Sequence, residues 1–287
     1  KWGNWLSDTI GFQGWRLDLA QGIEPWYVWE WLHYPGMRPG FSFMEYWEPA
    51  NGREEQEWLD LTGRKAAIYD SHLRSLLKQM CESGDAFDMR ELIAPSLLGL
   101  EPAYTVVYID NHDTMRCCDD FNSNGIPTKV GIQTNKPMAY AYAFHSQGLP
   151  MVYWREYFDQ PYVNLVAGGG LRGVKIQGEI NRLIKIRHIA VGGSLSVLHA
   201  DADIYAQQRE GGDNKYKSML VINHASTAKT NAIQTAWVNT VLVDLVATNG
   251  TPNSVTSSPS GSVTITMPGR SYRIYATTNA LNEVNKP

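Results

Sequence analysis

The sequence has few cysteines, no strong charge of either sign and no long apolar run, and each absence removes a class of protein. A formal net charge of −4 lacks the basic excess with which nucleic-acid binders neutralise phosphates. No run approaches the roughly 18 apolar residues that a membrane-spanning helix requires. We therefore expect neither a nucleic acid nor a membrane as a partner.

The three cysteines, Cys81, Cys117 and Cys118, do not have the spacing of a metal site. The adjacent pair fits disulfide geometry poorly across one peptide bond. A bridge from Cys81 to one of the pair is an alternative to ordinary buried thiols, which are the simpler expectation. Residues Lys1 to Ser7 lack the pattern of a signal peptide, but a processed or truncated chain would look the same. The compartment therefore stays open.

Tryptophan and tyrosine are abundant, with ten and fifteen residues in a chain of 287. Flat aromatic side chains stack on sugar rings, so the excess suits carbohydrate binding. Such side chains also pack in protein cores, which is the simpler explanation for any single one. The excess therefore favours carbohydrate binding for the chain as a whole, whereas core packing is the simpler explanation for any single residue.

Before residue 192, short apolar runs alternate with helical stretches, as in strand–helix units around a parallel sheet. The expected strands are 14–19, 41–45, 66–70, 105–109 and 151–154. The expected helices are 71–81, 136–146 and 179–190, and 26–31 is expected to be a tryptophan-rich loop.

After Gly192 and Gly193 the pattern becomes that of an antiparallel sheet, with short β-branched runs between polar turns. The expected strands are 204–208, 218–223, 240–244, 263–267 and 272–275. We expect a small all-β domain over 193–287 that ends in a loose tail from Asn279.

Three carboxylates, Asp18, Glu45 and Asp113, stand at the C-terminal ends of expected parallel strands. In a parallel α/β barrel these ends face one mouth, so residues distant in sequence can converge there. Glycoside hydrolysis requires such a group, because one carboxylate attacks or stabilises the anomeric carbon while another donates a proton.

The segments around these carboxylates resemble the α-amylase family of glycoside hydrolases. Gly14–Asp18 (GWRLD) matches the family's G-x-R-x-D strand, Met44–Trp47 (MEYW) its E-x-W segment, and Ile109–Asp113 (IDNHD) its x-x-N-H-D segment. Three motifs in the right order are a strong signal, although each one alone is weak.

The resemblance implies a role for each matching residue. Asp18 would be the nucleophile, with Arg16 holding it ionised and oriented, and Glu45 would be the general acid/base. Asp113 would bind the hydroxyls of the distorted sugar, and His112 would hydrogen-bond the same ring. The reaction would retain the anomeric configuration through a glycosyl-enzyme intermediate.

Four further residues are implied in binding. Asn111 and Trp47 would contribute to the substrate site, although Trp47 could equally anchor a loop. Gln21 stands where the family usually carries a sugar-binding lysine, and its amide could substitute by hydrogen bonding. The main-chain oxygen of Gly22 would bind calcium, which is thus the one cofactor that the resemblance implies.

Two supporting segments extend the resemblance over nearly the whole chain, from about Trp5 to Ala276. Gly148–Trp154, followed by Tyr157-Phe158-Asp159, is similar to the family's eighth strand and its loop. The stretches 183–188 and 200–205 are similar to its last barrel helix and the entry to its β domain. The resemblance is to plant, archaeal and maltooligosaccharide-forming bacterial α-amylases.

The resemblance also shows what is missing. A complete barrel takes eight strand–helix units, whereas the five expected strands correspond to the fourth through eighth. We therefore expect an α/β protein: part of a (β/α)₈ barrel over 1–192, followed by an antiparallel all-β domain over 193–287. The rest of the barrel would be supplied by preceding sequence or by a second chain.

The predicted function is hydrolysis of α-1,4-glucosidic bonds in an α-glucan: starch, glycogen or maltooligosaccharides. Two alternatives stay open. The chain could be a non-catalytic glucan-binding or scaffold protein derived from an amylase, or the same carboxylates could perform transglycosylation or α-1,6 cleavage. Taken singly, each motif also has a plainer explanation, such as a structural ion pair or a polar turn.

Overall fold

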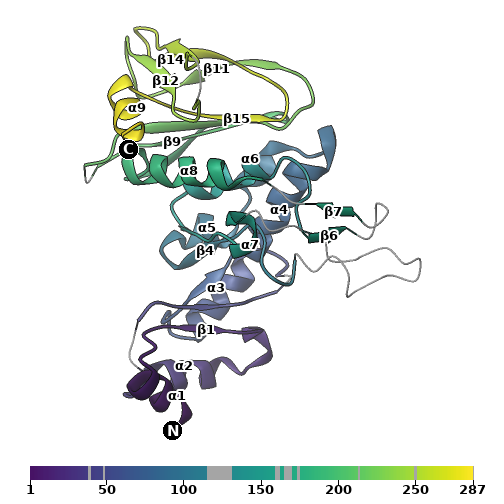
Figure 1. Cartoon of the computed structure of the whole chain (residues 1–287), viewed down its shortest axis with the longest axis vertical. Coiled ribbons are helices and arrows are strands. Elements are labelled where there is room, and N and C mark those ends of the chain that lie inside the picture. The colour runs from purple at the N-terminus through teal and green to yellow at the C-terminus, as the bar shows by residue number, and fades with distance from the viewer. Residues whose placement is uncertain are drawn as a thin grey trace. The chain divides into compact units, whose positions relative to one another are not determined.

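The computed structural model describes residues 1–37, 40–47, 49–114, 131–158, 162–164, 170–172, 175–212, 214–248 and 251–286. The chain forms two compact units, each with a core of its own (Figure 1). Unit 1 comprises Lys1–Leu76, Ile93–Tyr108 and Gly148–Met151. Unit 2 comprises Leu77–Leu92, Ile109–Gln147 and Val152–Pro287.

Unit 1 is built on a parallel sheet of five strands in the order β1-β2-β3-β4-β5. The strands are β1 (Trp15–Leu17), β2 (Ser42–Met44), β3 (Ala67–Tyr69), β4 (Thr105–Val107) and β5 (Leu149–Pro150). Sequence order equals spatial order, as in consecutive strands of a barrel. The first four lie within the predicted ranges. The fifth was predicted too late, because Trp154 begins helix α7 (Trp154–Tyr157).

The two faces of this sheet differ in what covers them, because alternate side chains of a strand point to opposite sides. Met44 and Ile68 pack into one core cluster with side chains from helices α2 (Pro25–His33), α3 (Gly52–Leu61) and α5 (Leu97–Leu100). The opposite face carries Phe43, Tyr69, Tyr108 and Met151. Among the described residues, helices α2, α3 and α5 therefore cover the face of the sheet that carries Met44 and Ile68.

Two helices of unit 1 correct the sequence prediction. The tryptophan-rich segment 26–31 lies in helix α2 and is not a loop. Pro25 at the first helical position suits the start of a helix, and Val28 and Leu32, one turn apart, pack into the core. Helix α3 was not predicted, and it begins where the Asn51 side chain accepts a hydrogen bond from the Arg53 amide at 2.9 Å. The predicted helix 71–81 is confirmed as α4 (Ser71–Glu82).

Unit 2 contains a β-sandwich with an apolar core. One sheet has the antiparallel order β13-β12-β15-β10-β9-β8, and the other pairs β11 with β14. The strands are β8 (Leu195–Ala200), β9 (Ile204–Arg209), β10 (Ser218–Asn223), β11 (Lys229–Gln234), β12 (Val241–Asp244), β13 (Ser254–Thr256), β14 (Ser262–Met267) and β15 (Ser271–Ala276). Side chains from both sheets interdigitate, among them Met219, Val221, Val263 and Ile265. The predicted fold class is confirmed, although β8, β11 and β13 were not predicted.

The helices of unit 2 extend beyond the prediction. Helices α6 (Lys136–His145) and α8 (Gln177–Ala190) confirm two expected helices and pack on each other. The expected loose tail is instead helix α9 (Thr278–Val284), which packs against α8 and β12 (Figure 1) because Ala280, Leu281 and Val284 form a buried stripe. Strand β6 (Tyr162–Asn164) pairs antiparallel with β7 (Gly170–Arg172).

The structure also bears on the expectations for the cysteines, the domain boundary and the membrane. Cys81 is a buried free thiol, whereas Cys117, Cys118 and Asp159 lie outside the described residues. Residue 192 lies between α8 and β8, and as a domain boundary it stays a prediction. None of the described helices is long and apolar enough to cross a membrane.

Helix α3 of unit 1 carries a buried carboxyl group. Glu55 on α3 is fully buried, and its Oε1 accepts a hydrogen bond from the Ser71 amide at 3.0 Å. Its Oε2 is buried with no hydrogen-bond partner among the described residues. Burial, reinforced by the charge of the buried Asp70, raises the pKa of Glu55 to about 10. Glu55 is therefore protonated at neutral pH.

We expect the stability of the protein to fall as pH rises, because the unfolded chain releases the Glu55 proton that the folded chain retains. The loss begins above the unfolded pKa near 4.5 and continues towards 10. Glu55→Gln mimics the protonated form, so urea unfolding should show the variant more stable at pH 9 by about 1 kcal/mol or more. Glu57→Gln, at an exposed position of the same helix, is the control. Equal pH dependence in wild type and Glu55→Gln would contradict this assignment.

Candidate active site

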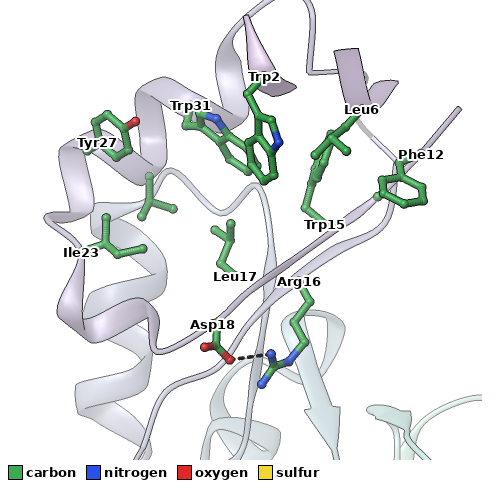
Figure 2. A pocket seen from close by; sticks show the side chains of 12 residues that line it. Trp2, Leu6, Phe12, Trp15, Arg16, Leu17, Asp18, Ile23, Tyr27 and Trp31 are labelled. Carbon is green, nitrogen blue, oxygen red and sulfur yellow. Dashed lines mark hydrogen bonds and ion pairs between the residues drawn. The ribbon is translucent and has the colours of Figure 1, made fainter. Parts of the chain in front are cut away.

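Two of the three predicted carboxylates share one guanidinium group. On β1, Arg16 Nη1 binds Asp18 Oδ1 at 2.6 Å, and Nη2 binds Glu45 Oε1 at 2.7 Å (Figure 2 shows the contact with Asp18). The parallel register of β1 and β2 pairs Arg16 with Phe43, so Glu45, just past β2, lies beside the end of β1. Both carboxylates therefore lie at the same edge of the sheet, on opposite arms of one guanidinium group.

The two carboxylates lie in different surroundings. The Asp18 side chain is 73% exposed, whereas that of Glu45 is 3% exposed. Glu45 Oε2 also accepts a hydrogen bond from the Leu19 amide at 3.2 Å. Leu19 adopts a left-handed φ of 43°, which costs a non-glycine residue about 1 kcal/mol or more. The backbone is thus strained where its amide contacts Glu45.

Arg16 remains cationic in this arrangement. Burial lowers the pKa of Arg16, but the hydrogen bond to Asp18 and the charge of Glu45 outweigh burial and raise its pKa above the ordinary value. Burial raises the pKa of the nearby Tyr69 hydroxyl, so that group stays neutral. The edge of the sheet thus holds one fixed positive charge between two acidic side chains.

Gln21 has a contact that the sequence did not predict. With its amide oriented to satisfy both neighbours, its nitrogen donates to the Glu45 carbonyl at 3.2 Å and its oxygen accepts from the Trp47 amide at 2.9 Å. The side chain therefore ties the turn after β1 to the segment that carries Glu45. A sugar contact by Gln21, and one by the half-buried Trp47, stay predictions.

The predicted residues 111–113 form a compact turn in unit 2. Asn111 Oδ1 accepts hydrogen bonds from the Asp113 and Thr114 amides at 3.0 and 2.9 Å. His112 Nε2 lies 3.2 Å from Asp113 Oδ2, and the His112 side chain is half exposed. Asn111 is buried and shapes the turn, and its Nδ2 has no partner among the described residues. Since Asp113 belongs to unit 2, its convergence with Asp18 and Glu45 stays a prediction.

The calcium prediction is not supported by a ligand cluster. Gly22 ends a 3₁₀ turn (Ala20–Gly22) and is exposed. The described part of the chain contains no group of three or more His, Cys, Asp or Glu side chains that could hold a metal ion. Calcium takes six to eight oxygen ligands, so one main-chain carbonyl does not by itself fit the ion.

Two further polar side chains of unit 2, His145 and Asp201, have structural contacts. His145 is fully buried, with Nδ1 at 3.0 Å from Gln207 and Nε2 at 3.1 Å from Ser218. Asp201 accepts hydrogen bonds from the amides of Asp203 and Ile204, which is a turn. Both side chains therefore stabilise the structure of unit 2.

A mostly apolar cavity of about 650 Å³ lies next to the Arg16–Asp18 pair (Figure 2). The figure shows aromatic side chains along it, opposite the ion pair. They are Trp2, Phe12, Trp15, Tyr27 and Trp31. The tryptophan excess indicated aromatic surfaces, but Trp2 and Phe12 have no motif that would have singled them out.

Sequence comparison finds relatives among the α-amylases, although no family model matches. The α-amylase of Geobacillus stearothermophilus is 26% identical over 225 residues, which are 77% of this chain and 38% of that protein. The Bacillus licheniformis α-amylase is 25% identical over 226 residues, which are 77% of this chain and 41% of that protein. A probable α-amylase of Arabidopsis thaliana is 27% identical over 225 residues, or 71% and 48% of the two chains.

Solved structures give the same result for the fold. An Anoxybacillus α-amylase superposes with a TM-score of 0.69 and 16% identity, over 95% of this chain and 60% of that chain. The Geobacillus thermoleovorans α-amylase gives 0.67 and 17%, over 96% and 62%. The fold is thus that of an α-amylase barrel segment with its C-terminal β domain.

These matches confirm the predicted resemblance: the chain is related to bacterial and plant α-amylases. It spans less than half the length of these three curated relatives.

The Arg16 bridge predicts a measurable coupling. Arg16→Met leaves the buried Glu45 without its cation, so the free energy of unfolding should fall by about 3 kcal/mol. Arg16→Met/Glu45→Gln removes the stranded charge and should recover a large part of that loss. Urea unfolding of wild type, both single variants and the double variant measures the coupling. Additive losses would show that the two groups do not interact.

Proposed function

We propose that the protein to which this chain belongs is a retaining glycoside hydrolase that cleaves α-1,4-glucosidic bonds in starch, glycogen or maltooligosaccharides. The observation that carries the proposal is the Arg16 bridge: one guanidinium holds an exposed and a buried carboxylate at neighbouring strand ends. Retaining glycosidases use two carboxyl groups in this division of labour. The relatives named α-amylase support the substrate class.

In the first half of the reaction, Asp18 attacks the anomeric carbon and Glu45 gives its proton to the departing glycosidic oxygen. Exposure suits Asp18 to direct contact with the sugar, and Arg16 keeps it ionised. Glu45 lies beside Asp18 through their shared contact with Arg16, so its carboxyl group is the one placed to give this proton. Breaking the C–O bond of the leaving sugar yields a glycosyl ester on Asp18.

In the second half, Glu45 takes a proton from water, and the resulting hydroxide displaces Asp18 from the anomeric carbon. The ester on Asp18 carries no charge, so Arg16 no longer forms an ion pair with Asp18 and keeps the one with Glu45. Both Glu45 oxygens already accept hydrogen bonds, from Arg16 and from the Leu19 amide, and these contacts hold the carboxyl group in place for this step. The same guanidinium therefore serves both halves of the cycle.

The remaining residues have binding roles in this proposal. Asp113 and His112 bind hydroxyls of the distorted sugar, and Asn111 holds their turn through the amides of Asp113 and Thr114. Gln21 holds the backbone around Glu45, and the Trp47 ring contacts the glucan. If calcium binds, the Gly22 carbonyl would supply one of the six to eight oxygen ligands that the ion takes.

Further strand–helix units complete the barrel in this proposal, on preceding sequence or on a second chain. Among the described strands, β1 has a neighbour on one side only, and a bare strand edge invites pairing. Large apolar side chains near it, including Trp2 and Phe12, are exposed. The solved α-amylases also extend well beyond the matched region.

Intact mass spectrometry of the native protein tests this completion. We expect a mass above the 32.2 kDa of this chain, or a second polypeptide that co-purifies with it. A folded, monodisperse protein of 32.2 kDa that hydrolyses glucans would overturn the proposed completion.

For the nucleophile, we expect Asp18→Asn to lower kcat on soluble starch by roughly 10⁴-fold or more, as when one member of a catalytic unit is removed. Glucan binding should survive, because the amide keeps the shape of the side chain. Glu24→Gln is the control, since Glu24 is an exposed carboxylate of unit 1 whose side chain does not cap α2. Undiminished turnover by Asp18→Asn would remove Asp18 from the mechanism.

The rival functions differ in their products. A non-catalytic glucan binder would release no reducing sugar from starch above background. Transglycosylation would convert maltoheptaose into longer or cyclic products, and α-1,6 cleavage would require branched substrates. We expect shorter linear maltooligosaccharides from maltoheptaose.

A further inference from the structure

A buried lysine in unit 2 connects the turn 110–114 to two helices. Lys136 is the first residue of α6, and its side chain is 1% exposed. Its Nζ donates to Asp110 Oδ2 at 2.7 Å and also binds Glu156 Oε1 on α7. The Tyr140 hydroxyl donates to the other oxygen of Glu156. An ammonium group is rarely buried unless it is paired in this way.

The partner of Lys136 is the carboxylate that organises the turn. Asp110 is fully buried, and its oxygens also accept hydrogen bonds from Thr114 Oγ1 at 2.7 Å and from the Ile132 amide at 3.0 Å. Thr114 Oγ1 in turn accepts from the Asn111 amide at 2.9 Å. Asp113 and His112 lie between these fixed points. The position of the turn thus depends on where Asp110 is held.

The charges of this cluster require Lys136 to stay protonated. Burial lowers the pKa of Lys136, but the charges of Asp110 and Glu156 outweigh burial and raise its pKa. Burial and the charge of Asp110 raise the pKa of Glu156, against the opposing effect of Lys136. Removal of Lys136 would take away the cation that Asp110 and Glu156 share, whereas Glu156→Gln would keep that cation and the shape of the Glu156 side chain.

We infer that Lys136, itself held by Glu156, is a positioning residue that sets the place of Asp113 and His112 through Asp110. Its effect reaches the turn through the hydrogen bond to Asp110 and through those that Asp110 and Thr114 make. The catalytic consequence rests on the proposed function, in which Asp113 acts on the distorted ring. The structural consequence does not depend on that function.

Hydrogen–deuterium exchange of the full chain tests the structural part. In Lys136→Met, the amides of Asn111, Asp113 and Thr114 should exchange about tenfold faster or more, because their acceptor side chains lose their anchor. Glu156→Gln should give a smaller increase. His145→Leu is the matched control, since it removes a buried polar group from the same helix and should leave the peptide 109–114 unchanged.

Kinetics on maltoheptaose test the catalytic part. We expect kcat to fall about 10²-fold in Lys136→Met with KM within about threefold, since displacement of a catalytic group by about 1 Å can cost that much. Glu156→Gln, which keeps the shape of the side chain, should show a smaller loss of the same kind. His145→Leu should keep kcat even if it melts earlier.

The outcomes separate the two proposals. Wild-type protein without glucan hydrolysis would count against the proposed function, and the exchange experiment would still decide whether Lys136 positions the turn. If Lys136→Met does not fold, Glu156→Gln decides in the same way. Unchanged exchange at 109–114 in a folded variant, or a kcat loss that His145→Leu shows equally, would overturn the positioning role.

Discussion

The candidate site in unit 1 depends on one cation, Arg16, which two carboxylates share. Asp18 and Glu45 lie at the ends of adjacent parallel strands, where two negative charges would repel and where burial of Glu45 would be costly. Arg16 resolves both conflicts, because its planar guanidinium presents separate N–H groups to the two carboxylates. A lysine would offer a point charge without this fork. The Leu19 amide, at a strained backbone position, binds the Glu45 side chain, and the Gln21 side chain binds the backbone of Glu45 and Trp47.

In unit 2, a buried cation likewise pairs with a carboxylate of the turn 110–114. Lys136 neutralises buried Asp110 much as Arg16 neutralises Glu45. The two cations differ in exposure: Arg16 is partly open to solvent, whereas Lys136 is enclosed. The β-sandwich contrasts with both sites, since its core is mostly apolar. Each unit thus buries a carboxylate that is paired with a cation, whereas the core cluster of the β-sandwich is apolar.

The sequence predicted the elements whose signals are local. Alternation and β-branched runs located β9, β10, β14 and β15, and the G-x-R-x-D pattern located Arg16 beside Asp18. It failed where tertiary packing decides the outcome. Helix α9 and helix α2 are stabilised by apolar stripes that pack on other elements, and their sequences read as tail and loop.

The same limit applies to the site. The burial of Lys136 could not be predicted, because a lysine at the start of a helix is normally solvated and its partners lie 26 and 20 residues away. Gln21 stood out only as a departure from a motif, and its backbone contacts depend on the register of β1 and β2.

Covalent trapping tests the central claim most directly. Protein with Glu45→Gln, which slows release of the intermediate, would be incubated with 5-fluoro-α-D-glucosyl fluoride, digested and analysed by mass spectrometry. The account predicts a fluoroglucosyl ester on the peptide that contains Asp18. An ester on another carboxylate, or hydrolysis of the reagent by wild type with no ester trapped in the variant, would contradict it.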